Sequence, residues 1–370
     1  MKIAFVSPGY APHRGGIETL VQAIAERLAA WGHQVDVLTL TTSAALPAMQ
    51  QVNHVTIRRF REWVPGDVYY VGLSLLPHLL ARGKDYDVVN AHNFHAMPLF
   101  WAGAICPTQL AASTHYHGHG HSVLANWIHP FYRPLGRWAV RRARRVICAS
   151  GMERDLVRVH FGVAEDKLDI VPDGIPLAAL RSAQPFDLPG VSLLYVGRLE
   201  RYKRVDLAIE ALAYLPGDHH LYVIGKGPDE PWLKQRAQRA QVADRVIFLK
   251  DVPNEDLFRW YRSAQALVMM SEAESFPMTS LEAMAAGCRV ICGSRPPFTE
   301  LAARFPEAVY AVQSITPRTV ADQIRTAAEV PGRVEADLSD YDWDSVAQTT
   351  LTTFERVASS RSSGNTRAVN

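Results

Sequence analysis

Two carboxylates that bracket a strand-to-helix turn are the first residues of this sequence whose type and spacing could do chemistry. Glu274 and Glu282 stand with seven residues between them in the stretch MSEAESFPMTSLEAMAAG, residues 270–287. An apolar run ends at this turn, and apolar residues at helical spacing follow it. Strand ends of doubly wound domains bind ligands, and helix starts favour anionic or polyol groups. The alternative is structural, with one glutamate complementing a helix dipole and the other on the surface.

Two cations stand at the end of another apolar run, where a diphosphate would need its charge neutralised. Arg198 and Lys203 follow Gly197 in the stretch LLYVGRLERYKRVDLAIEAL. Gly197 would allow a tight turn at the strand end, and the two cations would then project toward the ligand. The alternative is a solvated basic loop in which Glu200 is a local partner.

A glycine pair follows the next apolar run. Gly225 and Gly227 flank Lys226, which is the start of a dinucleotide-binding fingerprint, but the third glycine position of that fingerprint holds Glu230. The sequence therefore disfavours a dinucleotide site and is only weak support for a nucleotide site.

The elements that must position these residues alternate between strand-like and helix-like runs. The expected strands are Ile3–Val6, Val35–Leu40, Val55–Phe60, Val88–Ala91, Leu110–Ser113, Val146–Ala149, Ser192–Val196, Leu221–Ile224, Val246–Leu249, Ala266–Met270, Val290–Cys292 and Ala308–Val312. Apolar strands that alternate with helices predict parallel sheets covered on both faces. We therefore expect an α/β chain of two doubly wound, Rossmann-like domains that face a central cleft.

Domain limits follow from the breaks in this pattern. Residues 177–191 have little periodicity and three turn formers, which indicates an interdomain connection. We expect an N-terminal domain over 1–180 and a C-terminal domain over 181–340. A last helix over 341–358 is expected to pack back toward the N-terminal domain, ahead of a disordered tail over 359–370.

Composition narrows the class of protein. A chain of 370 residues is long enough for two cores, and a formal net charge of +2 gives no general attraction to nucleic acid. The four cysteines lack CxxC spacing, so we expect reduced core thiols. The first apolar run is too short for a secretory signal, and no run reaches the ~18 residues of a membrane span. We expect a cytoplasmic protein, and peripheral attachment to the cytoplasmic membrane face stays open.

Taken in order, these motifs resemble those of the retaining glycosyltransferase family 4. The resemblance rests on Gly15–Glu18 (GGIE), Val196–Arg198 with Lys203, Gly225–Gly227, and the segment from Glu274 to Glu282 with its trailing EAMAAG. It covers essentially the whole chain. It implies the GT-B fold, with a nucleotide-sugar donor mainly on the C-terminal domain and the acceptor mainly on the N-terminal domain.

The resemblance also implies roles for individual residues. Arg198 and Lys203 would hold the donor diphosphate and stabilise it as the leaving group, while Glu274 would face the donor sugar. Glu282 would hydrogen-bond the ribose hydroxyls. The other implied donor-binding positions are Gly16, Gly197, Gly225, Gly227, Phe276, Pro277, Met278 and Thr279.

The acceptor side is expected in the N-terminal domain, at Gly15, Gly16, His115 and His117. The alternating histidines of STHYHGHGHS could indicate a metal site, but no nearby cysteine or carboxylate completes one. The resemblance implies a catalytic histidine close to the donor sugar after this strand. His115 matches it best and His117 is the second choice, with a plain loop histidine as the alternative.

The sequence departs from the family pattern in the turn before Glu282. Many members have Glu-Gly-Phe-Gly where this chain has Glu274-Ser275-Phe276-Pro277. Proline has no N–H, so Met278 and Thr279 would have to provide any main-chain donor.

Two Asp-Tyr-Asp runs, 85–87 and 340–342, imitate the metal-binding DxD of the other large glycosyltransferase fold. Neither lies among the donor motifs, so both are interpreted as structural. We expect no metal and no cofactor, with the nucleotide sugar as co-substrate.

The segment Asn126–Arg145 mixes aromatic residues with six arginines. This composition suits an anionic membrane surface or a lipid-diphosphate acceptor. The alternative is a helix with one packed apolar side and one solvated basic side.

The expected reaction is the metal-independent, retaining transfer of a hexose-type sugar from a UDP- or GDP-sugar to an acceptor hydroxyl of a glycan or lipid-linked precursor. Breaking the sugar–diphosphate bond produces an anionic leaving group and an oxocarbenium-like sugar, so cations and carboxylates are the parts required. No covalent nucleophile is identifiable, so we infer front-face attack assisted by a donor phosphate oxygen. The alternatives are a nucleotide-sugar epimerase of the same fold and a nucleotide-sugar-binding protein without transfer.

Overall fold

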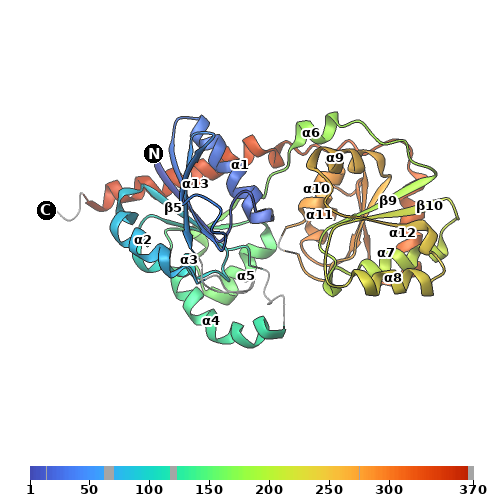
Figure 1. Cartoon of the computed structure of the whole chain (residues 1–370), viewed down its shortest axis with the longest axis horizontal. Coiled ribbons are helices and arrows are strands. Elements are labelled where there is room, and N and C mark those ends of the chain that lie inside the picture. Colours follow the sequence, from blue (N-terminus) through green and yellow to red (C-terminus); the bar gives the residue numbers. More distant parts are fainter. Residues whose placement is uncertain (14, 62–70, 117–122, 275, 366–370) are drawn as a thin grey trace. The chain divides into compact units, whose positions relative to one another are not determined.

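The computed structural model describes residues 1–13, 15–61, 71–116, 123–274 and 276–365, and only the backbone for 123–132 and 361–365. The chain forms two compact units (Figure 1). Unit 1 consists of Met1–Asp173 and the C-terminal segment from Trp343, and unit 2 is Gly174–Asp342. The first boundary thus falls before the expected limit at residue 180, and the last helix belongs to unit 1.

Unit 1 is built on an eight-stranded sheet in the order β3-β4-β2-β1-β5-β6-β7-β8. The strands are β1 Lys2–Ser7, β2 Gln34–Thr41, β3 Met49–Val52, β4 Val55–Arg61, β5 Val88–His92, β6 Leu110–Ser113, β7 Arg145–Cys148 and β8 Leu168–Ile170. All neighbours pair in parallel except β3 and β4. The sequence prediction missed β3 and β8, because both are short and lie at the sheet edges, where burial leaves a weak pattern.

Helices cover both faces of this sheet. They are α1 Gly16–Ala30, α2 Leu76–Arg82, α3 Met97–Ile105, α4 Val123–Arg142, α5 Gly151–Phe161 and α13 Trp343–Asn365. α13 packs on α1, β5 and β6, and the rings of Phe5 and Phe354 lie 5.8 Å apart. Burial of this ring pair joins the last helix to the first strand. α13 continues to Asn365, so the helix extends into the stretch 359–370 that was expected to be a disordered tail.

Unit 2 contains a six-stranded, fully parallel sheet in the order β11-β10-β9-β12-β13-β14. Its strands are β9 Val191–Val196, β10 His219–Ile224, β11 Val246–Leu249, β12 Ala266–Met269, β13 Arg289–Gly293 and β14 Val309–Val312. The helices are α6 Leu177–Ser182, α7 Val205–Ala211, α8 Glu230–Arg239, α9 Asn254–Ser263, α10 Met278–Ala285, α11 Phe298–Arg304 and α12 Pro317–Glu329.

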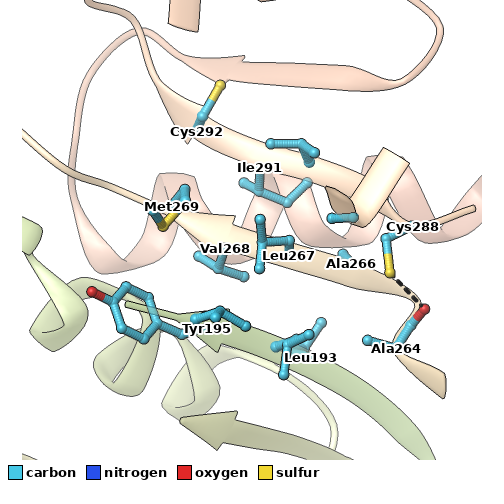
Figure 2. Packing of buried hydrophobic residues seen from close by; sticks show 14 of the residues in the cluster. Leu193, Tyr195, Ala264, Ala266, Leu267, Val268, Met269, Cys288, Ile291 and Cys292 are labelled. Carbon is cyan, nitrogen blue, oxygen red and sulfur yellow. Dashed lines mark hydrogen bonds between the residues drawn. The ribbon is translucent and has the colours of Figure 1, made fainter. Parts of the chain in front are cut away.

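The core of unit 2 lies around its central strands. Side chains of β9, β12 and β13 pack side by side in Figure 2, which explains why these strands are continuous apolar runs in the sequence. The Cys288 thiol donates to the Ala264 carbonyl at 3.1 Å. All four cysteines are free and buried, which confirms the prediction of unpaired core thiols.

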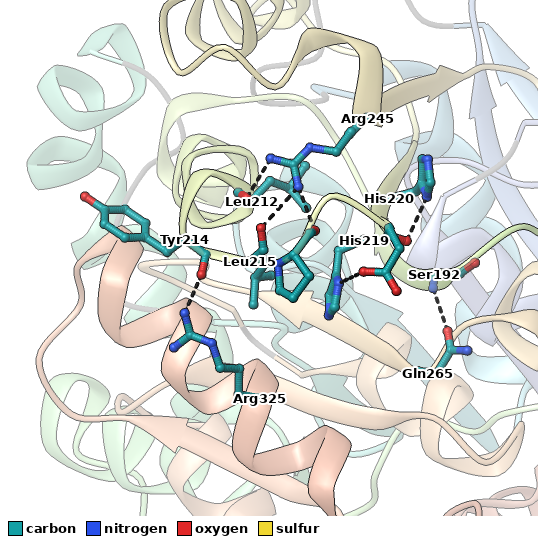
Figure 3. A network of polar contacts seen from close by, with 11 residues as sticks. Ser192, Leu212, Tyr214, Leu215, His219, His220, Arg245, Gln265 and Arg325 are labelled. Atoms are coloured by element: carbon teal, nitrogen blue, oxygen red, sulfur yellow. Dashed lines mark hydrogen bonds and ion pairs between the residues drawn. The ribbon is translucent and has the colours of Figure 1, made fainter.

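The amino-terminal edge of the same sheet is held by a polar network (Figure 3). Arg245 donates to the carbonyl oxygens of Leu212 and Pro216 at 2.8 and 2.9 Å. Gln265 Oε1 accepts from the main-chain N–H of Ser192 at 2.7 Å. These bonds satisfy main-chain and side-chain groups where the strands start, so the edge opposite them is the one left for ligands.

Candidate functional site

The first group of predicted site residues lies at the topological switch point of unit 2. After β9 the chain adds β10 and β11 on one side of the sheet, and then crosses to place β12 on the other side of β9. Arg198 and Lys203 follow β9, and Glu274 follows β12. Doubly wound sheets bind ligands at the carboxyl ends of the two strands where the order reverses. The sheet topology therefore brings together residues that are 71 positions apart in the sequence.

Lys203 and Glu274 form a close ion pair at this point. Lys203 Nζ lies 2.6 Å from Glu274 Oε1, and the two side chains are only 11% and 14% exposed. The main-chain N–H of Glu272 donates to the Tyr202 carbonyl at 2.8 Å, which joins the two loops next to the pair. An ammonium group has three N–H donors, and one of them points to Glu274. The pair can therefore present one cation and one carboxylate to a ligand at the same point.

Arg198 is placed differently from Lys203. Its side chain is 68% exposed, and its Nη2 lies 2.5 Å from Glu200 Oε1. Glu200 is the local partner that the alternative interpretation of the sequence predicted. The backbone of Arg198 is fixed, because the phenol of Tyr195 donates to its carbonyl oxygen at 2.8 Å. The guanidinium is largely exposed but Glu200 is only 16% exposed, so Arg198 has to leave a partly buried carboxylate in order to turn to a ligand.

Gly225 and Gly227 allow the loops after β9 and β10 to touch. A Cβ on Gly225 would lie 1.9 Å from the Gly197 carbonyl oxygen, and a Cβ on Gly227 would lie 2.2 Å from that of Leu199. Gly225 also has a φ of +150°, which disfavours any side chain. These glycines thus have a packing role that the sequence analysis did not consider. Their role in donor binding stays a prediction.

The turn before α10 contains the proline that departs from the family pattern. α10 begins at Met278, with Pro277 as its N-cap and no side-chain hydrogen bond to the cap. The N–H groups of Met278 and Thr279 belong to the first helical turn, which has no intrahelical acceptors. Phe276 packs toward Tyr341, with ring centroids 6.2 Å apart, and adds to the core of unit 2. Ser275 lies outside the described residues.

Glu282 is held by a residue that the sequence analysis did not single out. The phenol of Tyr261, at the end of α9, donates to Glu282 Oε2 at 2.7 Å. Burial raises the pKa of Glu282 to about 7, and the bond from Tyr261 opposes that rise. Tyr261 thus engages one carboxylate oxygen, and among the described residues no hydrogen-bond partner is found for the other. A Tyr at the end of the helix before a buried strand carries no chemical signature in the sequence, so only the structure reveals this partner.

In unit 1, His115 stacks on His92 beyond the ends of β5 and β6. The ring centroids are 5.4 Å apart, and His92 Nδ1 lies 3.1 Å from His115 Nε2. His92 Nε2 lies 2.6 Å from Asn90 Oδ1. Burial lowers the pKa of His115 to about 4 and that of His92 well below its ordinary value. Both imidazoles are therefore neutral at physiological pH.

A buried carboxylate fixes the backbone on either side of His115. Glu153 Oε1 accepts from the Thr114 hydroxyl at 2.5 Å and from the Tyr116 N–H at 2.6 Å. Its Oε2 accepts from the Ala149 N–H at 2.7 Å. His115 itself has a φ of +47°, in the left-handed region that a branched or bulky residue rarely adopts. The hydrogen bonds to Glu153 hold the backbone of this turn in place, and the role of His115 stays a prediction.

The other predicted acceptor-side residues are less tightly defined. Gly15 is the N-cap of α1, in extended conformation and without a side-chain cap. A Cβ on Gly15 or on Gly9 would meet the Glu18 carboxylate within 2.4 Å, whereas a Cβ on Gly16 would meet nothing within 4 Å. The group in the way of a Cβ on Gly15 is the far end of the flexible Glu18 side chain, which can move aside, so the structure gives no steric requirement for glycine at Gly15 or at Gly16. His117 lies outside the described residues.

The basic segment around α4 is partly used by the protein itself. Arg137 donates to the Phe161 carbonyl at 3.1 Å, and Arg142 lies over the Trp138 ring at 4.6 Å. Trp138 and Leu135 are 43% and 45% exposed, so an apolar patch stands beside these arginines. Side chains of residues 126–132 are outside the description. Among the described residues, no helix is long and apolar enough to cross a membrane.

The two Asp-Tyr-Asp runs have structural contacts. Asp87 accepts from the Lys2 N–H at 2.7 Å, and Asp340 pairs with Arg304 at 2.6 Å. Among the described residues, no group of three or more His, Cys, Asp or Glu side chains is arranged to hold a metal ion.

Solved structures with the same architecture define the class of the fold. Sucrose-phosphate synthase of Thermosynechococcus elongatus superimposes with a TM-score of 0.72 at 19% identity, covering 100% of this chain and 99% of that one. Anabaena HepE, determined in complex with UDP, gives a TM-score of 0.71 at 17% identity over 98% and 100% of the two chains. The chain thus has the GT-B fold of glycosyltransferases, as the motifs predicted.

Sequence comparison gives the family. A family model described as Glycosyltransferase Family 4 matches residues 14–179, and one described as Glycosyl transferases group 1 matches residues 179–340. The chain belongs to the group 1, family 4-like glycosyltransferases.

Curated relatives agree with this assignment. The D-inositol 3-phosphate glycosyltransferase of Xylanimonas cellulosilytica is 27% identical over 76% of this chain and 75% of the relative. The glycogen synthase of Mycobacterium tuberculosis is 27% identical over 96% and 94% of the two chains. The protein is therefore a glycosyltransferase.

Proposed function

We propose that this glycosyltransferase moves a hexose-type sugar from a UDP- or GDP-sugar to an acceptor hydroxyl with retention of anomeric configuration. The Lys203–Glu274 ion pair at the switch point of unit 2, with its 2.6 Å separation, is the observation that carries the proposal. It supplies a cation for the leaving diphosphate and a carboxylate for the positive charge that develops on the sugar. HepE, which shares the fold, has been solved with UDP-glucose.

The other residues have complementary roles in this proposal. Arg198 neutralises the diphosphate, Glu282 binds the ribose hydroxyls with its free oxygen, and the N–H groups of Met278 and Thr279 bind donor oxygens. His115 meets the donor sugar or the acceptor. With no covalent nucleophile among the predicted site residues, the acceptor hydroxyl attacks from the front face and passes its proton to a donor phosphate oxygen. Neither a metal nor a further cofactor takes part.

The acceptor is proposed to be a glycan or a lipid-linked precursor. The exposed Trp138 and Leu135 beside the arginines of α4 support a contact with an anionic lipid surface. Flotation with vesicles of anionic or zwitterionic lipid tests this part, since binding to both or to neither would contradict an electrostatic contact.

Nucleotide release from a panel of UDP- and GDP-sugars tests the reaction. We expect one donor to be turned over and Lys203→Ala to lower kcat by about 100-fold or more, as loss of leaving-group stabilisation does. Glu274→Gln is expected to act similarly. Lys234→Ala is the matched control, because Lys234 pairs with Glu230 on an exposed part of the same unit and lies outside the donor motifs. The proposal fails if no donor binds, or if Lys203→Ala and Lys234→Ala behave alike. Conversion of the donor sugar without any acceptor would identify an epimerase.

A further inference from the structure

The hydrogen bonds that link Asn90, His92 and His115 determine which ring nitrogen of His115 carries the hydrogen. The chain of contacts starts at Asn90 in β5. Asn90 Nδ2 lies 2.9 Å from the Ala111 carbonyl oxygen and 3.0 Å from Ser113 Oγ. A carbonyl oxygen can only accept, so the NH₂ group must point to Ala111. The amide oxygen of Asn90 therefore faces His92.

This amide oxygen assigns the tautomer of His92. Asn90 Oδ1 is an acceptor only, and it lies 2.6 Å from His92 Nε2. His92 Nε2 must therefore carry the hydrogen. His92 is buried at 2% exposure and neutral, so its Nδ1 has a lone pair. His92 thus donates this hydrogen bond and Asn90 accepts it.

His92 in turn determines the tautomer of His115. Its Nε2 lies 3.1 Å from the lone pair of His92 Nδ1, so this nitrogen must donate. A neutral His115 then has its single acceptor lone pair on Nδ1. Among the described residues no hydrogen-bond partner is found for this atom. It is also not one of the fully buried side-chain nitrogen and oxygen atoms that lack a partner. Nδ1 is therefore the polar atom that His115 offers to a ligand.

We propose that Asn90 and His92 are positioning residues that hold His115 in the Nε2–H tautomer, so that its Nδ1 accepts a hydrogen bond from the ligand. The ligand group at this atom must then be a donor, such as a sugar hydroxyl. A phosphate oxygen or an ionised carboxylate cannot occupy it favourably, because it would face a lone pair. The inference rests on the proposed function only in naming a sugar as the source of the hydroxyl.

Fixing a tautomer has a consequence for specificity. A histidine that can exchange tautomers is able to donate or accept a hydrogen bond at the same nitrogen. It therefore tolerates ligand groups that accept as well as groups that donate. A histidine fixed as an acceptor rejects a ligand in which the matching hydroxyl is replaced by hydrogen or fluorine, because neither can donate. We therefore expect His115 to select for one hydroxyl of the bound sugar.

Nitrogen NMR of the full chain with ¹⁵N-labelled histidine tests the tautomer without any need for activity. His115→Gln assigns the signals. We expect the wild-type protein to show His115 with hydrogen on Nε2 and none on Nδ1. Hydrogen on Nδ1 would overturn the proposal, whatever the protein turns over, and this measurement depends on no further variant.

His92→Phe tests whether the hydrogen bonds of Asn90 and His92 fix the tautomer of His115. Phenylalanine keeps the ring that stacks between Phe5 and His115 but has no Nδ1 acceptor. We expect the ¹⁵N shifts of the two ring nitrogens of His115 to move toward each other, as tautomers mix. His78→Phe is the matched control, since His78 of unit 1 contacts Tyr86 instead. Unchanged His115 shifts in His92→Phe would overturn the proposal.

Kinetics with the donor found for the enzyme test the specificity. We expect His92→Phe to lower kcat/KM about ten-fold, the effect of one misplaced hydrogen bond, with the affinity for the nucleoside diphosphate unchanged. In the wild type, deoxy and fluoro analogues at one sugar position should lose activity equally, and His115→Ala should abolish this discrimination. Discrimination that survives in His115→Ala would refute the assignment. If no donor is turned over at all, the proposed function fails while the tautomer result still stands.

Discussion

Removing the phenol of Tyr261 should move the titration of Glu282 and, with it, the pH dependence of donor binding. The phenol donates to Glu282 Oε2 at 2.7 Å and stabilises the ionised carboxylate. Burial already raises the pKa of this carboxyl to about 7. A hydrogen bond to a charged group contributes about 1.5 kcal/mol at the low end, which equals about one pKa unit. In Tyr261→Phe the pKa should therefore rise to about 8.

This shift can be converted into a change in affinity. At about pH 7.5, the ionised fraction of Glu282 falls from about three quarters to about one quarter when its pKa rises by one unit. If the ionised form binds the ribose hydroxyls, the nucleotide affinity should fall about three-fold at this pH. At about pH 9 the two proteins should bind almost equally, because Glu282 is then ionised in both.

Calorimetric titration of UDP and GDP between about pH 5.5 and 9 measures this shift. The 2′,3′-dideoxy nucleotides are the control ligands, because they carry the same ionisable phosphates but lack the ribose hydroxyls. The difference in pH dependence between the two kinds of nucleotide therefore reports the ionisation of Glu282. Tyr222→Phe is the control variant, since Tyr222 lies in the same unit and its ring packs on Trp260, with centroids 4.7 Å apart. A shared pH midpoint for Tyr261→Phe and wild type would contradict the expected role of the phenol. The same pH dependence for ribose and dideoxy nucleotides would contradict the expected role of Glu282.

Stability should respond to pH in the same window. The folded-state pKa of Glu282 is raised above its ordinary value of 4.5 to about 7, so the folded protein holds more protons than the unfolded chain between these values. The contribution of this group to the free energy of unfolding therefore falls as pH rises from about 4.5 to about 7, and is flat above that. In Tyr261→Phe the fall should continue to about pH 8, which denaturant titrations at several pH values can measure.

Three further predictions concern the parts of the fold that position the site. Gly225→Ala should destabilise the protein by at least about 2 kcal/mol, because its Cβ would lie 1.9 Å from a carbonyl oxygen, whereas Gly217→Ala, with open space around it, should be neutral in urea titrations. Glu153→Gln should cost about 2 kcal/mol in the same assay, since an NH₂ group would face main-chain N–H donors; unchanged stability would contradict this. The pKa of His115 is lowered to about 4, so its contribution to stability is full above about pH 6.5 and is lost as pH falls through 4; His115→Gln should weaken this acid loss in urea titrations at several pH values.

The local pattern was sufficient for much of this protein. Apolar runs of four to eight residues, each followed by a glycine or a polar turn, were enough to predict two parallel-sheet units and the ends of most strands. The same pattern placed Arg198, Lys203 and Glu274 at strand ends. This works because a buried parallel strand must be apolar on both faces, which leaves polar residues only where it ends. Short edge strands such as β3 Met49–Val52, exposed along most of their length, escape this rule.

Residue types and local patterns therefore identify the residues that could act, whereas the packing of distant segments sets which of them come together. The crossing of the chain from β11 to β12 places Glu274 2.6 Å from Lys203, and no local pattern encodes that distance. Tyr261 and Glu282 meet for the same reason. So do Asn90 and His92 of β5 and His115, which follows the neighbouring strand β6. A tautomer or a raised pKa depends on burial and on the polarity of each partner. Both are properties of packing between segments distant in sequence, so they exist only in the folded chain.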